Sequence, residues 1–199
     1  MDLGNSVNKE QRLQRTKSEA EEAVRVLLEY MGEDPSREGL SETPERVVRA
    51  WSEYCVGYSS DPATVLKKTF DNSEKYLEPV VLRDISFVSH CEHHLAPING
   101  FVDVAYVPSE RIVGISKIAR VVECFARRLQ TQETMTAQIA NCIQDSLMPA
   151  GTAVRSRATH ACMTNRGVCK SGTLMTTSAF KGVFLSDLVL RNQFMNRQI

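Results

Sequence analysis

Cysteine and histidine, two residue types that zinc prefers as ligands, gather at two places in this 199-residue chain. All four histidines lie there: His90, His93 and His94 around Cys91, and His160 near Cys162. Cys91 and His94 have a C-x-x-H spacing, which places two ligands on one turn around a metal ion. His160 and Cys162 are two residues apart in a predicted strand, so both side chains would project from the same face. The two clusters together predict a metal site.

The residues by themselves leave the nature of this site open. Cys91 and Cys162 could instead be small buried hydrophobic residues, with the histidines as surface polar groups. Two cysteines and four histidines also exceed the four ligand positions of zinc, so neither the ligating histidine nor the choice between a closed structural site and an open catalytic site is fixed. At an open site, a spare histidine could transfer protons near pH 7 while the metal activates water.

A second group of residues has the types that bind phosphate. The segment from Ser116 through Lys117 to Arg120 opens a predicted helix, where free backbone N–H groups, a hydroxyl and two cations would face an anion. Arg166, in the loop just after Cys162, adds a cation near the predicted metal. Lysine and arginine at a helix start are usually just solvated, so this pattern is weak by itself.

Hydrophobic spacing predicts the elements that must position these residues. Apolar residues three and four apart predict helices, and alternation predicts strands. The predicted helices are 19–31, a segment from Thr43-Pro44 to just before Gly57, 117–129 and 131–147; the predicted strands are 79–89, 101–107, 152–162 and 173–184. Ser116 and Thr131 are the predicted N-caps of the third and fourth helices, and a short helix would finish the chain. The central order is strand-strand-helix-helix-strand-strand, which predicts one α+β domain.

Composition excludes several classes of protein. With 42% apolar and 24% charged residues, the chain is of the ordinary globular kind. It has no apolar run long enough to cross a membrane and no signal-peptide pattern at its start, so we expect a cytoplasmic location, no membrane partner and six cysteines that stay reduced. The zero net charge argues against nucleic acid as a partner.

The zero net charge results from an acidic segment and a basic segment that offset each other. Residues 1–59 carry 12 acidic and 8 basic side chains, whereas residues 115–170 carry 8 basic and 3 acidic ones. A small anionic ligand needs only a local cationic pocket. The overall balance therefore argues against long polyanions and leaves a triphosphate possible.

Several segments resemble those of the GTP cyclohydrolase I family, the zinc enzymes that begin pterin and folate synthesis. They are Ser89-His-Cys-Glu-His-His94, Val113-Gly-Ile-Ser-Lys-Ile-Ala-Arg120, Arg128-Leu-Gln-Thr-Gln-Glu133, Thr159-His-Ala-Cys-Met163 and Arg166-Gly-Val168, with 32–40 and 42–46 upstream. The resemblance runs in order from about Ala20 to the C-terminus. It implies the tunnelling fold, ββααββ, with an antiparallel sheet and two helices on one face. It also implies one domain over 1–199, with a helical N-terminal extension at 1–75 and the core at 76–199.

The resemblance assigns catalytic roles by position. The family's zinc ligands, one ion per chain, fall on Cys91, His94 and Cys162, and leave the fourth position for water. The family opens the guanine ring of GTP hydrolytically at C8, releases formate and forms 7,8-dihydroneopterin triphosphate. His160 would then protonate the imidazole nitrogen of guanine, while His93 and Ser116 would move protons around the ribose.

The resemblance also assigns the substrate contacts. Glu133 would hold guanine, because one carboxylate can accept from both N1–H and the 2-amino group, a donor pair that adenine lacks. The remaining substrate contacts fall on Gln132, Lys117, Arg120, Arg166, Arg46 and Arg49, the last two reaching in from a neighbouring subunit. The family assembles as a homodecamer whose active sites lie between subunits.

Some positions depart from the common pattern of the family, namely Asp103, Asn165 and the pair Ile98-Asn99; none of them is a ligand or a named catalytic residue. Two other classes stay open at this point. A related tunnelling-fold enzyme acting on a pterin or a deazapurine would carry three zinc-binding histidines or a cysteine nucleophile. A zinc-stabilised binding module would leave Glu133 without a role. A nucleobase deaminase is excluded, because its pair of H-x-E and P-C-x-x-C motifs is absent.

Overall fold

The computed structural model describes residues 15–199 and divides the chain into two compact units, Met1–Glu53 and Tyr54–Ile199. In the first unit, α1 (Lys17–Tyr30) begins with a capping box: the Thr16 hydroxyl accepts from the Glu19 N–H, and the Glu19 carboxylate accepts from the Thr16 N–H. The helix α2 (Thr43–Tyr54) begins at the predicted Thr-Pro pair. Lys17 and Glu45 join the two helices by an ion pair of 2.9 Å.

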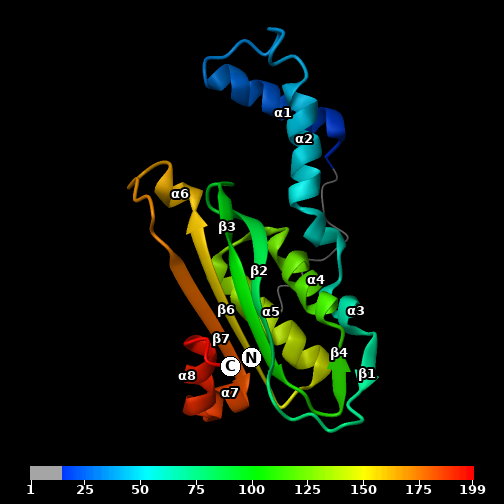
Figure 1. The fold of residues 1–199 in the computed structure, drawn as a ribbon. Coiled ribbons are helices and arrows are strands. Elements are labelled where there is room, and N and C mark those ends of the chain that lie inside the picture. The colour runs from blue at the N-terminus through cyan, green and yellow to red at the C-terminus, as the bar shows by residue number, and fades with distance from the viewer. Residues whose placement is uncertain (1–14) are drawn as a thin grey trace, which may run out of the picture. The chain divides into compact units, whose positions relative to one another are not determined.

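The second unit is built on a five-stranded sheet in the order β5-β2-β3-β6-β7 (Figure 1). Its strands are β2 (Val80–Cys91), β3 (Pro97–Val107), β5 (Leu129–Gln130), β6 (Gly151–His160) and β7 (Met175–Gly182). All neighbouring pairs are antiparallel except β2 and β5, which are parallel. The helices α4 (Ile115–Ala126) and α5 (Gln132–Leu147) pack on one face of the sheet. This confirms the predicted α+β class and the ββααββ order.

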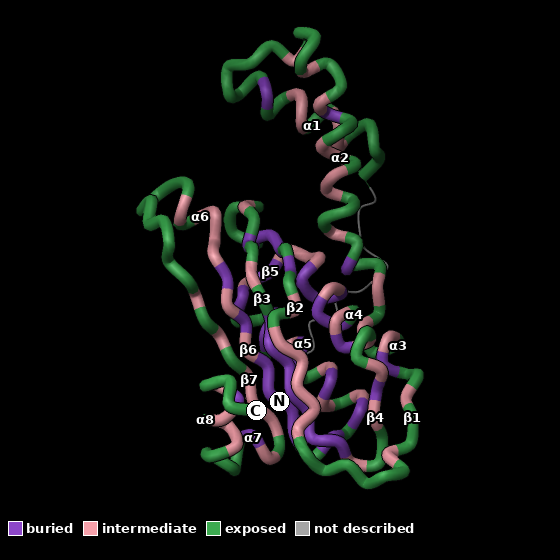
Figure 2. The backbone as a smooth tube through the Cα atoms, viewed as in Figure 1, coloured by how far each residue is buried: buried purple, intermediate pink, exposed green. Residues whose placement is uncertain are grey.

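The sheet is covered on both faces at its Val107 end. The main core lies between the sheet and the helices α4 and α5, with fully buried residues such as Val102, Val104, Ile118, Val121, Ile139 and Ile143. A smaller core, built around Ala105, Ala153, Phe184 and Phe194, lies under α7 (Val183–Ser186) and α8 (Leu188–Met195). Residues 102–107 of β3 are therefore buried on both sides of the strand, as Figure 2 shows by the purple backbone.

Short elements account for most of what the sequence analysis did not predict. They are the 3-10 helix η2 (Val56–Ser59), α3 (Pro62–Leu66), β1 (Thr69–Asp71), β4 (Arg111–Val113) and β5. The strand β1 pairs with β4, about 40 residues further along the chain, so no local pattern announces it. Residues 54–75, which we expected in the helical extension, are part of the second unit and contain a strand. None of the described helices is long and apolar enough to cross a membrane.

Three local expectations can be compared with the structure. Thr131 caps α5, since its hydroxyl accepts from the Thr134 N–H, as predicted. Ser116 is not a cap: Gly114 holds that position, and Ser116 is the second residue of α4. Cys162 is not on a strand: β6 ends at His160, and Cys162 lies on the short helix α6 (Ala161–Thr164).

The end of β7 also comes earlier than predicted, at Gly182. Its φ of +55° is in the region that favours glycine, and a Cβ there would overlap the carbonyl oxygen of Ala150. The chain then turns into α7, which begins at Val183, and the predicted C-terminal helix follows as α8.

Candidate active site

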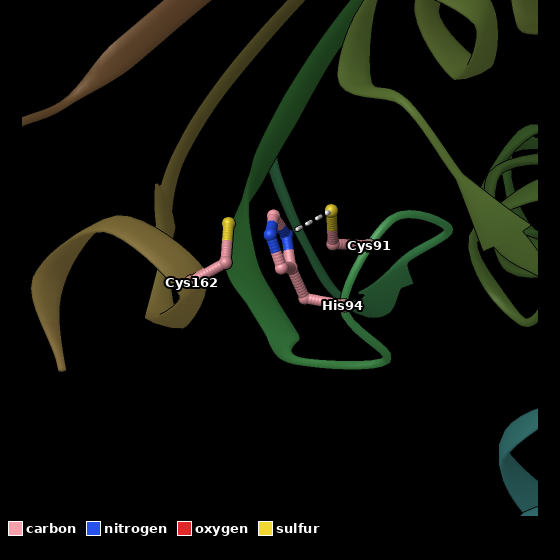
Figure 3. A group of neighbouring side chains, drawn as sticks. All are labelled: Cys91, His94 and Cys162. Carbon is pink, nitrogen blue, oxygen red and sulfur yellow. Dashed lines mark hydrogen bonds between the residues drawn. The ribbon is translucent and has the colours of Figure 1, made fainter. Parts of the chain in front are cut away.

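Three side chains able to ligate a metal meet where β2 and β6 end: Cys91, His94 and Cys162 (Figure 3). Their ligand atoms all lie within 4.8 Å of one another, and His94 Nδ1 lies 3.9 Å from Cys91 Sγ. Figure 3 shows the imidazole ring between the two sulfur atoms. Two thiols and one imidazole form a donor set that suits zinc and leave one tetrahedral position for another ligand. The predicted cluster is therefore present and can hold a metal ion.

A tight turn after β2 brings His94 back over Cys91. The Cys91 carbonyl accepts from the Leu95 N–H at 2.8 Å, and the Cys91 N–H donates to Ala96 O at 2.8 Å. Leu95 has a φ of +55°, so the chain reverses there and continues into β3. The C-x-x-H spacing thus corresponds to one closed turn, which holds both ligands on the same side.

Cys162 reaches the cluster from the opposite direction along the chain. In the antiparallel pair of β3 and β6, His160 lies opposite Ile98, so β6 ends beside the start of β3 and the turn just described. The first turn of α6 then carries Cys162 toward His94. Burial and the neighbouring thiol of Cys91 raise the pKa of Cys162. A bound cation would act in the other direction, because it stabilises the thiolate.

The other histidines differ in their surroundings. The side chain of His93 is 65% exposed, and its Nδ1 lies 3.9 Å from Cys91 Sγ. His160 is half-buried, and its Nε2 lies 2.8 Å from Gln132 Oε1. Burial lowers the pKa of His160, and the negative charge of Glu133 opposes that shift. His90 is buried, with its ring centroid 4.6 Å from that of Tyr54.

The first two residues of α5 point in opposite directions. Glu133 is exposed in the first turn of the helix, where a carboxylate is also favoured by the helix dipole. Gln132 is only 1% exposed, and its amide is hydrogen-bonded inside the protein. We expected Gln132 among the substrate contacts, but its buried side chain offers almost no surface to a ligand.

Three polar residues around Gln132 escaped the sequence analysis: Thr136, Ser156 and Thr177. Thr136 is four residues after Gln132, so both lie on the face of α5 whose other buried residues are apolar. Two polar residues at this spacing on an apolar face were the sequence signal for a buried polar group. Ser156 and Thr177 come from β6 and β7, and nothing local connects them to α5.

Two of the predicted phosphate-binding residues, Ser116 and Lys117, do not lie at this cluster within one chain. The C-terminal end of α4 leads into β5, where Gln130 lies opposite Cys91. Ser116 and Lys117 are at the other end of α4, and a helix of twelve residues is about 18 Å long. Within one chain they therefore lie at the end of α4 that is remote from Cys91.

The remaining predicted contacts are exposed arginines, apart from the half-buried Lys117. Arg120 lines a cavity on α4 with Glu123 and Cys124, and Arg166 follows α6. Arg46 and Arg49 are on α2, and Arg46 is paired with Glu42 one helical turn earlier.

The fold and the cluster define a class, an α+β protein with a Cys-His-Cys metal-binding group beside a half-buried histidine. Residues 20–198 match the family model of GTP cyclohydrolase I. The chain belongs to the GTP cyclohydrolase I family.

Curated relatives agree with this assignment, and each is named GTP cyclohydrolase 1. The protein of Hyphomonas neptunium is 54% identical over 181 residues, which cover 91% of this chain and 88% of the relative. Those of Pelagibacter ubique and Maricaulis maris are each 52% identical, over 89% and 90% of this chain and 88% of each relative. Among solved structures, the apo archaeosine synthase QueF-Like aligns with 54% of this chain and 94% of that chain, with a TM-score of 0.43 and 16% identity.

Proposed function

We propose that this chain hydrolyses the guanine ring of GTP at C8, releases formate and forms 7,8-dihydroneopterin triphosphate, the first step of tetrahydrofolate and pterin synthesis in the cytoplasm. Its family and relatives support this activity. The observation that carries the proposal is the Cys91-His94-Cys162 cluster, with the half-buried His160 two residues before one of its thiols. The chain would work as one domain, since the family match spans residues 20–198.

The metal we propose is zinc, one ion per chain, held by Cys91, His94 and Cys162. The donor set supports this choice, because sulfur and imidazole nitrogen are preferred zinc ligands, and three protein ligands are typical of catalytic sites. When bound, zinc would act as a Lewis acid and activate water for attack on C8 of guanine.

The chain's own residues then bind guanine and move protons. Glu133 accepts hydrogen bonds from N1–H and the 2-amino group of guanine, a role that its exposure on α5 permits. His160 gives a proton to the imidazole nitrogen of guanine as the ring opens. Its partial burial favours a neutral ring after transfer, because burial penalises the charged form. His93 and Ser116 serve proton transfer around the ribose.

The triphosphate contacts require more than one copy of the chain. We assign them to Lys117, Arg120 and Arg166. Arg46 and Arg49 would reach the substrate from a neighbouring subunit. Ser116 and Lys117 lie about a helix length from the metal cluster of their own chain, so they would complete the site of a neighbouring copy. This separation supports a homo-oligomer, which we propose to be the decamer of the family.

Turnover of GTP tests the proposal directly. The zinc-loaded protein is incubated with GTP, and formate and the fluorescence of the oxidised pterin product are measured with and without a chelator. We expect both products, and their loss on chelation. Binding of a pterin without turnover of GTP would favour a related tunnelling-fold enzyme. Unfolding on chelation with no nucleotide consumed would favour a zinc-stabilised binding module.

A further inference from the structure

Gln132 is a buried amide that no step of the proposed reaction uses. Its Nε2 lies 3.2 Å from Ser156 O, 3.1 Å from Met175 O and 3.2 Å from Thr177 Oγ1. Its Oε1 lies 2.8 Å from His160 Nε2. The side chain therefore connects α5 with β6 and β7 at one end and with His160 at the other.

The partners of Gln132 permit only one orientation of its amide. Backbone carbonyl groups accept hydrogen bonds and cannot donate them, so the group that faces Ser156 and Met175 must be the NH2. A flipped amide would place its oxygen against two carbonyl oxygens. The oxygen of Gln132 consequently faces His160.

This orientation decides which nitrogen of His160 carries a hydrogen. An amide oxygen is an acceptor only, so Nε2 of His160 must donate. In the neutral ring the lone pair is then on Nδ1. No residue in the described part of the chain hydrogen-bonds to Nδ1, and the ring is half-buried rather than closed off. Nδ1 is thus the nitrogen left for a substrate.

A buried polar network fixes Gln132 in place. The hydroxyl of Thr136 lies 2.7 Å from Gln132 O, 2.9 Å from Ser156 Oγ and 2.7 Å from Thr177 Oγ1. Thr136 and Ser156 are at most 1% exposed. Thr177 Oγ1 also contacts the Gln132 amide, so the network reaches the side chain through this hydroxyl. Because the partners of the amide come from two strands and are themselves hydrogen-bonded, the amide has little freedom to rotate.

We propose that Gln132 is a positioning residue, which holds His160 as the tautomer protonated at Nε2 so that Nδ1 exchanges the proton with the substrate. The proposal rests on the proposed GTP reaction for its kinetic consequences. When Nδ1–H gives its proton to the guanine ring nitrogen, the N–H bond of His160 breaks, a new N–H bond forms on guanine, and the neutral tautomer that remains is the one Gln132 stabilises. A proton from water then restores Nδ1–H.

The tautomer can be tested without any turnover. The chain has only four histidines, so ring-15N-histidine labelling gives a simple NMR spectrum, and His160→Ala assigns the signal of interest. At a pH where the ring is neutral, we expect Nε2 to be protonated in the wild type and Gln132→Met to lose this single tautomer. A ring protonated at Nδ1 in the wild type, or an unchanged spectrum in Gln132→Met, would overturn the proposal.

Kinetics with GTP form the second arm. We expect Gln132→Met to lower kcat roughly 10- to 100-fold, with KM and zinc content unchanged. Gln144→Met is the matched control, since Gln144 is also a hydrogen-bonded glutamine of α5 but contacts Pro149 and Thr152; we expect it to keep kcat.

Each kinetic outcome has one meaning. A higher KM with unchanged kcat in Gln132→Met would show that the side chain contacts the substrate. Equal losses of kcat in Gln132→Met and Gln144→Met would show that Gln132 contributes only to packing. Either result would overturn the proposal. Absence of GTP turnover in the wild type would overturn the proposed function instead. The NMR test would still decide the tautomer in that case.

Discussion

The two thiols of the metal cluster differ in burial. Cys91 is 5% exposed, whereas Cys162 is half-buried on α6. Replacing either by serine removes a thiolate, and a hydroxyl stays protonated at neutral pH and binds zinc poorly. We expect Cys91→Ser and Cys162→Ser to lose most of their bound zinc, as measured by atomic absorption on the purified protein. Cys169→Ser is the control, because Cys169 is exposed and outside the cluster; if it lost zinc equally, the assignment of ligands would be wrong.

Glu133 carries the expected discrimination between guanine and adenine. Its neutral isostere, Glu133→Gln, can accept only one of the two hydrogen bonds and brings a donor toward the 2-amino group. Hydrogen bonds to a charged group contribute about 1.5–3 kcal/mol, so we expect KM for GTP to rise roughly 10- to 100-fold. Zinc content should not change, since Glu133 is not part of the metal cluster. Asp145→Asn, near the other end of α5, is the control, and an unchanged KM in Glu133→Gln would remove guanine binding from this residue.

At the scale of elements, the buried carboxylate of Asp103 links β3 to β2. The sequence showed this residue only as a departure from the family pattern. Asp103 on β3 is fully buried. It accepts a hydrogen bond from Arg83 at 3.3 Å and one from the Asp84 N–H at 2.9 Å, at the point where the register of β2 shifts. Asp84 has a φ of +53° there. The carboxylate therefore stabilises both the bulge and the guanidinium beside it.

Removing this carboxylate should destabilise the second unit. In Asp103→Ala, Arg83 loses its carboxylate partner, and the Asp84 N–H loses its side-chain acceptor. Among the described residues, Arg83 then keeps only the main-chain oxygens of Phe194 and Ile199 as hydrogen-bond acceptors. Breaking one partner of a buried ion pair typically costs about 3–5 kcal/mol. Urea unfolding measures the change. Asp71→Ala is the matched control, because Asp71 pairs with Arg111 on the surface, where its side chain is 83% exposed, and we expect little effect. Equal stability of the two variants would contradict this account.

The long elements were predictable because each has its own periodic pattern. Both α4 and α5 present an apolar face to the sheet, and their four neighbouring strands follow in the predicted order. The short elements β1, β4 and β5 were not predictable, since two or three residues form a strand only when a distant partner is present. The same reason explains why Cys162 was wrongly predicted to lie on a strand. The pairing of β6 with β3 ends at His160, and no local pattern in the sequence marks that end.

Part of the candidate site was likewise predictable from the sequence and part was not. Residue types and the C-x-x-H spacing predicted the cluster of Cys91, His94 and Cys162, while the choice of His94 over the other histidines came from the family resemblance. The position of Gln132 was not predictable. A glutamine at the start of a helix is ordinarily solvated, and only the contacts with Ser156 and Met175 on other strands bury it.

At the scale of the whole molecule, the cations expected to bind a triphosphate are spread over the chain. Residues 115–170 carry 8 basic and 3 acidic side chains. Even so, Lys117 lies near one end of α4, and Arg166 follows α6 beyond the other. A single chain does not gather them around one ligand, although a triphosphate needs several cations within a few ångströms. Assembly of several copies would supply that concentration of charge.

Complementation between inactive variants tests this sharing. We expect His160→Ala and Lys117→Ala each to lose most turnover. Their coexpression should restore part of it, because some sites then combine an intact His160 from one copy with an intact Lys117 from another. The matched control is coexpression of His160→Ala with Cys162→Ser. His160 lies two residues before the cluster residue Cys162 in the same chain, so every site lacks one of them and turnover should not return. No recovery in the first pair would show that each chain completes its own site. Recovery in the control would show that returning turnover does not report the sharing of Lys117 between copies.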